Sequence, residues 1–422
     1  MGFLGQTLSS LRSRNFRLFF IGQTISNSGN WLTMVALTLL VLHRTGSGVA
    51  VGFVAACQFG PILVLSAWAG VIADRTDKRR MLILTQSLEM AQSFALGALA
   101  FMPDAPLGAF YAIAGAGGAM LAFDNPARRA FVNEMVPLAD VPNAVTLYSA
   151  VVNLSRIIGP AVAGVLIVTV GYGWCFTLDA ISYVTVLVAL GMMRPAELRR
   201  VPVTPRGPGQ IRAGLRYIFC VPDLWISFAI LLIIGTLSYN FTVVFPLLVE
   251  EGLGGSDGAY TFVYSASSVG ALIAALFVAR RTTVGLRSVV GGAVALGVSL
   301  LLLAAVPNIG VAAVMAAVVG GAGIAYLTAT TALAQIGTEQ HMIGRVLAIQ
   351  TVLLVGTTPI GGPLLGALAD AAGARAPVLL GGVGALAAAA FGGVAARRAG
   401  IPLSVVRTGP NERSASDFDD LG

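Results

Sequence analysis

Three charged residues lie inside long apolar stretches of the sequence: Glu89, Arg156 and Asp179. If these stretches cross a membrane, an ionised side chain without a partner costs at least about 2.5 kcal/mol there, so each residue needs a partner or water. Helical geometry places Glu89 roughly 12 Å and Arg156 roughly 18 Å from the ends of their stretches. These two could pair with each other. A buried carboxyl can also carry a proton, so Glu89 and Asp179 are candidates for proton coupling.

A stripe of amide side chains marks the first apolar stretch. Gln23, Asn27 and Asn30 recur at the i, i+4 and i+7 spacing that places side chains on one face of a helix. A polar group that faces lipid is costly, so this face is expected to point into a cavity or toward a partner helix. Substrate contact and hydrogen bonding between helices are both consistent with the stripe.

The sequence does not contain the residue patterns of an enzyme or of an ATP-driven pump. Paired carboxylates within an apolar stretch, an HExxH motif and a Walker motif are all absent. His43 and His341 fall on opposite sides of the membrane in the topology derived below. We therefore expect no enzymatic activity, no cofactor and no metal site. Cys57, Cys175 and Cys220 do not define a disulfide framework.

The whole chain has the composition of a membrane protein. Of its 422 residues, 56% are hydrophobic and 11% are charged, whereas soluble globular proteins contain about 25% charged residues. The net charge of +7 does not indicate nucleic-acid binding, because the basic residues lie between apolar runs instead of gathering on one face with aromatic side chains. The expected partner is the lipid bilayer and not nucleic acid.

Twelve apolar stretches are long enough to span a bilayer, which requires about 20 residues of helix. Barrel strands are about 10 residues long with alternating polarity, so they do not fit these stretches. The expected fold class is an all-α polytopic membrane protein with 12 transmembrane helices. The expected spans are 18–42, 49–73, 81–103, 105–123, 144–169, 176–193, 224–249, 258–279, 288–306, 309–332, 346–369 and 376–396.

The basic residues predict the orientation of these spans. With the N-terminus inside the cell, 23 of the 26 Lys and Arg residues fall in cytoplasmic segments, and cytoplasmic loops carry such an excess. Both termini are therefore expected to be cytoplasmic.

The chain divides into two six-helix halves around an Arg/Pro/Gly-rich segment. A short repeat supports this division, because IGPAVAG (158–164) and GGPLLGA (361–367) occupy corresponding positions in the two halves. In the linker, Ile211, Leu215 and Ile218 share one helical face, which predicts an amphipathic helix at the membrane surface. The expected organisation is a bundle over 1–193, a cytoplasmic linker over 194–223, a bundle over 224–397 and a cytoplasmic tail over 398–422.

The segment GVIADRTDKRR, between the second and third spans, resembles the signature loop of the major facilitator superfamily. The matching residues are Gly70, Asp74, Arg75, Lys78 and Arg79. Asp77 replaces the second glycine of the family pattern. The resemblance implies that Asp74 meets the positive N-terminal end of span 11. It also implies that the adjoining basic residues pair with acids at the end of span 4, where Asp124 is the matching acid. A basic loop that only enforces orientation is the alternative.

Within this superfamily, the N-terminal half resembles the branch of enterobactin exporters and macrolide-efflux proteins. The resemblance rests on NFRLFFIGQTISNSGNWLTMVAL, the signature loop, FDNPARRAFVNEMVP, NLSRIIGPAVAG and LDAISY. It implies a proton-driven secondary transporter of the bacterial plasma membrane that exports amphipathic drugs or siderophores by alternating access. It is expected to function as a monomer.

One departure from the branch concerns the residue that would carry the proton. Many relatives carry an acid in span 1 where this chain has Asn30. An amide cannot carry a proton, so a coupling residue must lie elsewhere.

Two alternatives to a proton-driven exporter remain. An importer or a lipid flippase on the same fold is the first alternative. A transporter-derived receptor or scaffold without flux is the second.

The resemblance also assigns residues to the transport path. Span 5 carries a motif similar to the antiporter motif of exporters, which consists here of Arg156, Gly159, Pro160 and Gly164. Such a kinked, closely packed helix can form a rocking interface, and ordinary packing of small residues is the alternative. In the resembled fold, spans 1, 4, 7 and 10 line the cavity, which adds Tyr111, Thr236, Tyr239, Asn240 and Tyr326 to the stripe on span 1.

The same fold offers a second reading for two of the buried acids. It places span 3 toward the periphery, so Glu89 could instead belong to a structural network. Asp179 lies near the outer end of span 6 and could be an interfacial cap.

Overall fold

The computed structural model describes residues 8–199, 210–278 and 285–400, and for residues 67, 71, 74, 210 and 211 it describes the backbone alone. Within these residues the chain is helical and contains no strand. The elements are η1 (Ser9–Arg12), α2 (Arg14–Thr45), α3 (Gly48–Arg75), α4 (Lys78–Ala100), α5 (Leu107–Glu134), η2 (Leu138–Asp140), α6 (Val141–Val170), α7 (Tyr172–Met192), η3 (Pro195–Glu197), α8 (Gln210–Cys220), α9 (Pro222–Leu237), α10 (Phe241–Pro246), the π-helical η4 (Leu247–Gly252), α11 (Asp257–Val278), α12 (Leu286–Ala304), α13 (Ile309–Ile336), α14 (Ile343–Val355), α15 (Thr358–Ala372) and α16 (Ala376–Arg398).

Eleven helical segments of the described chain are long and apolar enough to cross a membrane. This confirms the prediction of an all-helical, multi-pass membrane protein, because a helix satisfies its own backbone hydrogen bonds in lipid. Each of the twelve expected spans coincides with one helix or with a broken helix. The third, α4, is not among the eleven apolar segments. It begins with three basic residues and contains Glu89, which lower its mean hydropathy.

Two of the expected spans are broken helices. The seventh consists of α9, α10 and η4, and it leaves helical geometry at Asn240. The Asn240 amide donates to the carbonyl oxygens of Gly235 (3.1 Å) and Thr236 (2.9 Å), which lose their helical partners at the break. The eleventh span consists of α14 and α15, which are separated at Gly356 and Thr357.

Helix α5 continues past the predicted end of the fourth span, at residue 123, and reaches Glu134. The extension contains Asp124 and Arg128, which are spaced i, i+4 and form an ion pair on one helix face. Arg128 is 2% exposed and lies within this helix and not in a loop, while its expected place on the cytoplasmic side stays a prediction. Pairing with Asp124 lets the guanidinium stay buried.

The predicted amphipathic helix of the linker is present as α8. Ile218 is buried and Leu215 is 41% exposed, while the side chain of Ile211 lies outside the described residues. Gly214 of α8 packs against Arg345 and Ile349 of α14. The helix therefore lies against the second bundle at the start of α9.

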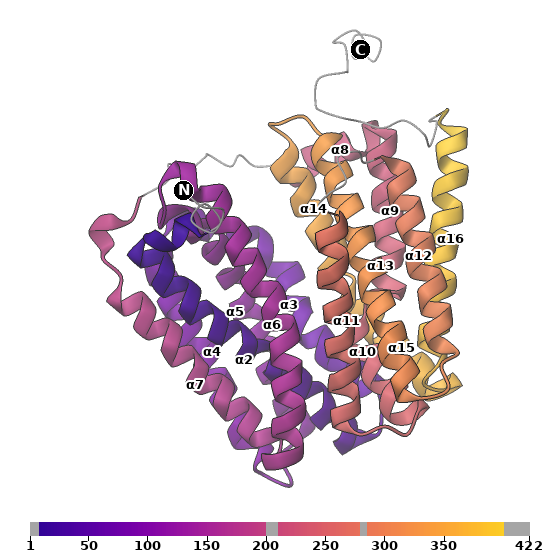
Figure 1. Ribbon diagram of the computed structural model, residues 1–422, viewed down its shortest axis with the longest axis horizontal. Helices are drawn as coiled ribbons and strands as arrows, with labels where there is room; N and C mark the ends of the chain where they lie inside the picture. Colours follow the sequence, from indigo (N-terminus) through magenta and orange to yellow (C-terminus); the bar gives the residue numbers. More distant parts are fainter. Residues whose placement is uncertain (1–7, 200–209, 279–284, 401–422) are drawn as a thin grey trace.

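The helices form two bundles, α2–α7 and α9–α16, which stand apart at the end that carries α8 and meet at the opposite end (Figure 1). The first residues of α2 and the last residues of α16 lie at the same end as α8. Between the bundles, α3 packs against α15 and α6 packs against α11. The molecule therefore has one open end and one closed end.

Glycines allow α3 and α15 to approach each other at the closed end. A Cβ added to Gly52 would overlap the backbone of Gly362, and a Cβ added to Gly366 would overlap the backbone of Gly48. The two helices therefore pack backbone to backbone, as small residues permit in membrane proteins.

Gly52→Val is expected to separate the bundles at this contact, because overpacking of this kind costs about 1–3 kcal/mol. Gly60→Val, on the same helix, is the matched control, because an added Cβ meets open space there. The measurement is the yield of a disulfide between cysteines placed at Ser47 and Asp370, whose side chains are 2.8 Å apart, in a background without the native cysteines. Gly52→Val should lower this yield relative to Gly60→Val. Equal yields would show that the contact does not depend on the glycine.

Candidate functional site

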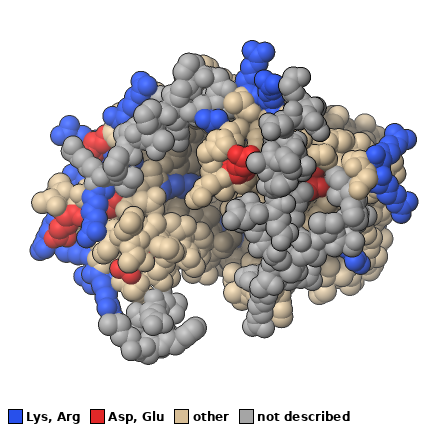
Figure 2. Space-filling view, turned by 90° about the horizontal axis from the view of Figure 1, so that it is seen from above, with Lys and Arg blue, Asp and Glu red and all other residues tan. Residues whose placement is uncertain are grey.

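A cavity of about 820 Å³ lies between the bundles. Figure 2 looks onto the open end of the molecule and shows a hollow between the two halves, with Lys and Arg side chains mostly along the outer edge of this face. Among the described residues, the first bundle forms nearly the whole wall, and the second contributes Thr331 and Gln335 of α13. The wall contains both amide side chains and apolar or aromatic side chains, and the latter include Trp31, Met34 and Phe59.

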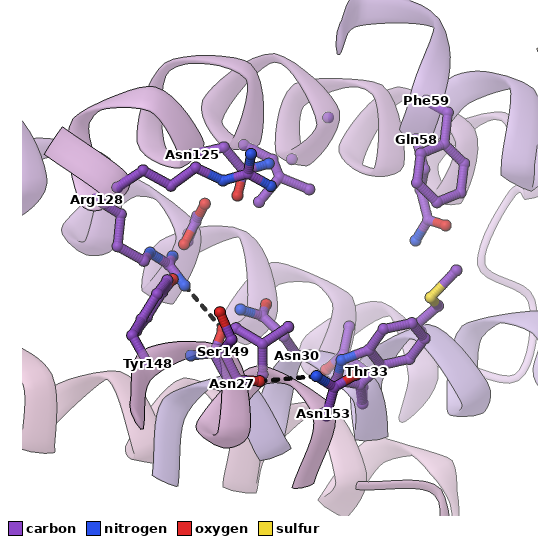
Figure 3. A pocket seen from close by; sticks show the side chains of 18 of the residues that line it. Asn27, Asn30, Thr33, Gln58, Phe59, Asn125, Arg128, Tyr148, Ser149 and Asn153 are labelled. Carbon is purple, nitrogen blue, oxygen red and sulfur yellow. Dashed lines mark hydrogen bonds between the residues drawn. The ribbon is translucent and has the colours of Figure 1, made fainter. Parts of the chain in front are cut away.

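The amide stripe on α2 forms part of this wall. Asn27 and Asn30 line the cavity (Figure 3), whereas Gln23 is buried one turn away. The Asn27 amide donates to the backbone carbonyl oxygen of Gln23 (2.9 Å) and to its side-chain oxygen (3.1 Å). Asn27 Oδ1 accepts a hydrogen bond from Arg128 (2.8 Å), and Asn30 Oδ1 accepts one from the Tyr183 hydroxyl (2.6 Å). The stripe therefore positions a guanidinium and a phenol at the cavity.

Behind this wall, Arg128 belongs to a buried network with two acids. Asp124 is 0% exposed, forms the ion pair with Arg128, and accepts hydrogen bonds from Thr85 (2.8 Å) and Gln86 (2.9 Å). Gln86 also donates to Glu89 (3.0 Å). Glu89 is 3% exposed and lines the cavity. The amide of Gln86 therefore links the two carboxylates.

Asp179 is the third acid of this region. It is 1% exposed and accepts hydrogen bonds from Thr33 of α2 and Ser93 of α4, both at 2.7 Å. The suggestion that Asp179 is an interfacial cap is therefore wrong, because its carboxylate lies inside the bundle between three helices. Ser93 is one turn from Glu89 on α4, so Asp179 lies close to Glu89.

Glu89 and Arg156 do not pair with each other, so that possibility is excluded. Arg156 lies over the Trp31 ring, with its guanidinium carbon 5.1 Å from the ring centroid. Tyr239, Tyr264 and Arg156 line a second, small pocket of about 30 Å³. Arg156 of the first bundle therefore meets aromatic side chains of the second bundle.

The antiporter-like motif on α6 contacts both bundles. Gly159 lies against Ser28 and Trp31 of α2, and Gly164 lies against Thr261 of α11. Pro160 is buried inside the helix. The glycines therefore occupy positions where α6 approaches its own bundle on one side and the other bundle on the other side.

Six of the eight predicted cavity residues do not line the large cavity: Gln23 and Tyr239, already described, and Tyr111, Thr236, Asn240 and Tyr326. Tyr111 packs edge-on against Phe53, with ring centroids 5.1 Å apart. Thr236 and Asn240 belong to the break between α9 and α10, and Tyr326 is buried inside the second bundle. The reason is the asymmetry of the cavity, whose described wall belongs almost entirely to the first bundle.

The signature loop joins the ends of α3 and α4. Gly70 is half-buried and Arg75 is exposed, while the side chain of Asp74 lies outside the described residues. Arg79 donates to the carbonyl oxygen of Leu190 (2.8 Å) at the end of α7. Asp77, the departure from the family pattern, caps α4 by accepting from the backbone N–H of Arg80 (3.0 Å).

The acid that meets this loop is Glu134 and not Asp124. Lys78 Nζ lies 2.8 Å from Glu134 Oε1. Asp124 is more than two turns earlier on α5, where Arg128 neutralises it. The expected pairing of the loop with Asp124 is therefore wrong. Because α5 extends to Glu134, the acid that reaches the loop is the one at the end of this helix.

Several residues of the cavity wall are absent from the sequence-based candidates. They are Gln58, Gln92, Asn125, Arg128, Asn133, Tyr148, Ser149 and Asn153. The sequence does contain a pattern that could have identified two of them. Ser149 and Asn153, together with Arg156, have on span 5 the same i, i+4, i+7 spacing as the amide stripe on span 1. Asn125, Arg128 and Asn133 lie on α5 beyond the predicted end of its span, and Gln58, Gln92 and Tyr148 lie on α3, α4 and α6.

At the closed end, Asp370 of α15 caps the first turn of α3. Its carboxylate accepts hydrogen bonds from the backbone N–H groups of Gly48 (2.6 Å) and Val49 (3.1 Å) and from the Ser47 hydroxyl (2.8 Å). A carboxylate at a helix N-terminus is stabilised by the helix dipole. This contact joins the two bundles.

Comparison with known proteins places the chain among transporters. The family model described as transmembrane secretion effector matches residues 5–401. The multidrug efflux pump Tap of Mycolicibacterium fortuitum is 29% identical over 383 residues, 86% of this chain and 91% of Tap. The enterobactin exporter EntS of Shigella boydii is 26% identical over 84% of this chain and 85% of EntS. The staphyloferrin A transporter of Staphylococcus aureus is 27% identical over 62% of this chain and 66% of that transporter.

Solved structures show the same fold. A bacterial homolog of the human lysosomal transporter Spinster, in an inward-facing and occupied conformation, superposes with a TM-score of 0.72 over 92% of this chain and 97% of that one, at 14% identity.

Proposed function

The chain belongs to the transmembrane secretion effector family of major facilitator transporters, and we propose that it exports amphipathic small molecules across the bacterial plasma membrane in exchange for protons. Membership in this family confirms the predicted resemblance and makes the protein a membrane transporter and not an enzyme. Its relatives include multidrug efflux pumps and siderophore exporters, which supports a small-molecule substrate.

We propose that α4 is the twelfth span and that both termini are cytoplasmic. Helix α4 packs between α5 and α7, each of which is long and apolar enough to cross a membrane. Lys and Arg side chains are numerous on the face at the open end (Figure 2), and cytoplasmic surfaces hold the excess of Lys and Arg. In this orientation the cavity faces the cytoplasm and the closed end faces outward.

The two bundles, 1–193 and 224–397, are the units that move in this proposal, with the linker 194–223 and the tail 398–422 on the cytoplasmic side. Closure at the outer end through α3–α15 and α6–α11 accompanies the open cavity at the inner end. Reversal of these contacts would open the outer end and let Asp74 meet the N-terminal end of α14. The protein acts as a monomer in this scheme, because one chain supplies both bundles.

The observation that carries proton exchange is the buried acid network at the cavity. Glu89, Asp124 and Asp179 are three buried acids of the first bundle, and Arg128 is the one buried Arg or Lys among the described residues. Three ionised carboxylates would leave two negative charges without compensation in a medium of low dielectric constant, which is costly. We therefore assign a proton to this network. Glu89 is the acid that exchanges it, because it alone among the three lines the cavity.

The wall of the cavity supports an amphipathic substrate. Trp31, Met34 and Phe59 offer apolar surface, and Asn27 and Asn30 offer amide groups. Pockets of a few hundred Å³ with mostly apolar walls and a few polar groups suit drug-sized molecules.

Accumulation assays test the proposal. The chain is expressed in a bacterial host that lacks its own efflux pumps, and cells are loaded with fluorescent drugs or assayed for secreted siderophore. Export predicts lower intracellular accumulation than in cells with an empty vector. Higher accumulation would indicate an importer, and no change for any compound would favour a flippase, a receptor or a scaffold. Each of these results contradicts the proposal.

Asp370→Ala is expected to weaken the closed outer end. Loss of a helix cap costs about 1 kcal/mol, which is a roughly fivefold change in population. The measurement is the distance distribution between spin labels at Thr76 and His341, both exposed at the open end, and the short-distance population should grow. Asp104→Ala, an exposed acid between α4 and α5, is the control. Identical distributions for the two variants would contradict a gating role for Asp370.

A further inference from the structure

Four polar side chains from both bundles meet at the closed end of the molecule. His43 lies in the last turn of α2 and Tyr172 begins α7 in the first bundle, while Glu250 of η4 and Asp257 of α11 belong to the second. His43 Nε2 lies 3.3 Å from Glu250 Oε2 and 3.3 Å from Asp257 Oδ1. The transport scheme above gives none of these residues a role.

The separations match the edges of a metal coordination sphere. Zinc binds imidazole nitrogen and carboxylate oxygen at about 2.0–2.2 Å in a tetrahedron, so neighbouring ligand atoms are roughly 3.3–3.6 Å apart. The ligand atoms of His43, Glu250 and Asp257 all lie within 4.8 Å of one another. Direct hydrogen bonds between charged groups are shorter, at about 2.7–2.9 Å.

Tyr172 determines which histidine nitrogen faces the two acids. Its hydroxyl donates to Asp257 Oδ2 (2.7 Å), since an ionised carboxylate can only accept. The same oxygen contacts His43 Nδ1, where it must act as acceptor, so Nδ1 carries the hydrogen. The lone pair of neutral His43 is then on Nε2, directed at the carboxylates. Such an outer hydrogen-bond partner is characteristic of metal-binding histidines.

The two acids are poorly satisfied without a cation. The Glu250 side chain is 9% exposed, and its Oε1 has no hydrogen-bond partner among the described residues. The carboxylates of Glu250 and Asp257 lie within 4.8 Å of each other, and two ionised carboxylates at such a distance repel unless a positive charge lies between them. His43 is 48% exposed, which leaves one side of the cluster open to water.

We propose that His43, Glu250 and Asp257 bind a divalent transition-metal ion of the zinc class, with water in the fourth position and Tyr172 as the outer partner. The ligands come from both bundles, so a bound ion holds the closed end together. Only the consequence for transport rests on the proposed function: an ion at this site stabilises the conformation whose cavity faces the cytoplasm, and it slows export.

The test is zinc binding by the purified full-length chain after treatment with a chelator. Equilibrium dialysis with Zn²⁺ alone should give one ion per chain, and Zn²⁺ should raise the melting temperature. His43→Gln and Glu250→Gln should abolish both effects, and Tyr172→Phe should weaken binding about tenfold or more. His341→Gln is the matched control, because His341 lies on the other face, 3.3 Å from Glu339, and both side chains are largely exposed.

Two results would overturn the metal site. One is zinc binding that is equal in the wild type and in His43→Gln. The other is stabilisation of the closed end by acidic pH with no response to Zn²⁺, which would make the cation a proton on His43. Binding is measured without transport, so failure to find an exported compound would contradict the proposed function and leave the metal site standing. Zinc binding without slower export would refute the predicted consequence for transport.

Discussion

Arg128→Met is expected to be among the most destabilising single substitutions in the first bundle. It leaves Asp124, which is 0% exposed, without its cation, and breaking a buried pair in this way costs about 3–5 kcal/mol. Arg129→Met changes the neighbouring, exposed arginine and should cost no more than about 0.5 kcal/mol. The measurement is thermal unfolding of the purified proteins in one detergent.

A double variant separates loss of the ion pair from general damage to the packing. In Arg128→Met with Asp124→Asn, the amide oxygen still accepts from Thr85 and Gln86, and no uncompensated charge remains at position 124. Most of the lost stability should return. A double variant no more stable than Arg128→Met alone would show that the ion pair is not what holds this region together.

Glu89→Gln is expected to abolish uphill transport and to leave the protein folded. Glutamine has the shape of glutamate and keeps the contact with Gln86, but it cannot release a proton. Exchange of substrate down its own gradient should continue, because the cavity wall is otherwise unchanged. Uptake into everted vesicles, with and without a proton gradient, separates the two activities.

Asp104→Asn is the control for this variant, because it makes the same charge change on an exposed acid away from the cavity. Its uphill transport should equal that of the wild type. If Glu89→Gln also transports uphill at the wild-type rate, the exchanging proton is carried by another group.

Hydropathy predicted the helical fold because a membrane leaves the chain few other ways to satisfy its backbone. It failed at α5, where a charged segment after residue 123 reads as a loop. The structure keeps that segment helical and buries it, since Asp124 and Arg128 neutralise each other one turn apart. Charge alone therefore marks the end of a span poorly when the opposite charge follows at i+4.

The candidate site was predicted in part, and the successes and failures have different physical origins. Asn27 and Asn30 were identified because helical spacing is a local property of the sequence. The partner of a buried charge is not local, so Glu89 was considered with Arg156 although the structure places it with Asp124 and Arg128. Tyr111 and Tyr326 were placed in the cavity by analogy of spans. In this conformation the described wall of the cavity belongs mostly to the first bundle. The spacing of residues in the sequence does not indicate which conformation the two bundles adopt.

The cluster at His43 was also invisible to sequence reasoning. Its ligands come from positions 43, 250 and 257, which no motif connects. The closed end brings them together only because the two bundles touch there. Sequence analysis considered His43 only together with His341 and therefore expected no metal site.

The central claim is that export is coupled to protons through the buried acids at the cavity. The most direct measurement is accumulation of an exported compound by everted membrane vesicles under an imposed gradient, acid inside. The account predicts uptake by wild-type vesicles that stops when a protonophore collapses the gradient, and no uphill uptake by Glu89→Gln vesicles. Wild-type uptake that continues at full rate after the gradient is collapsed would contradict it.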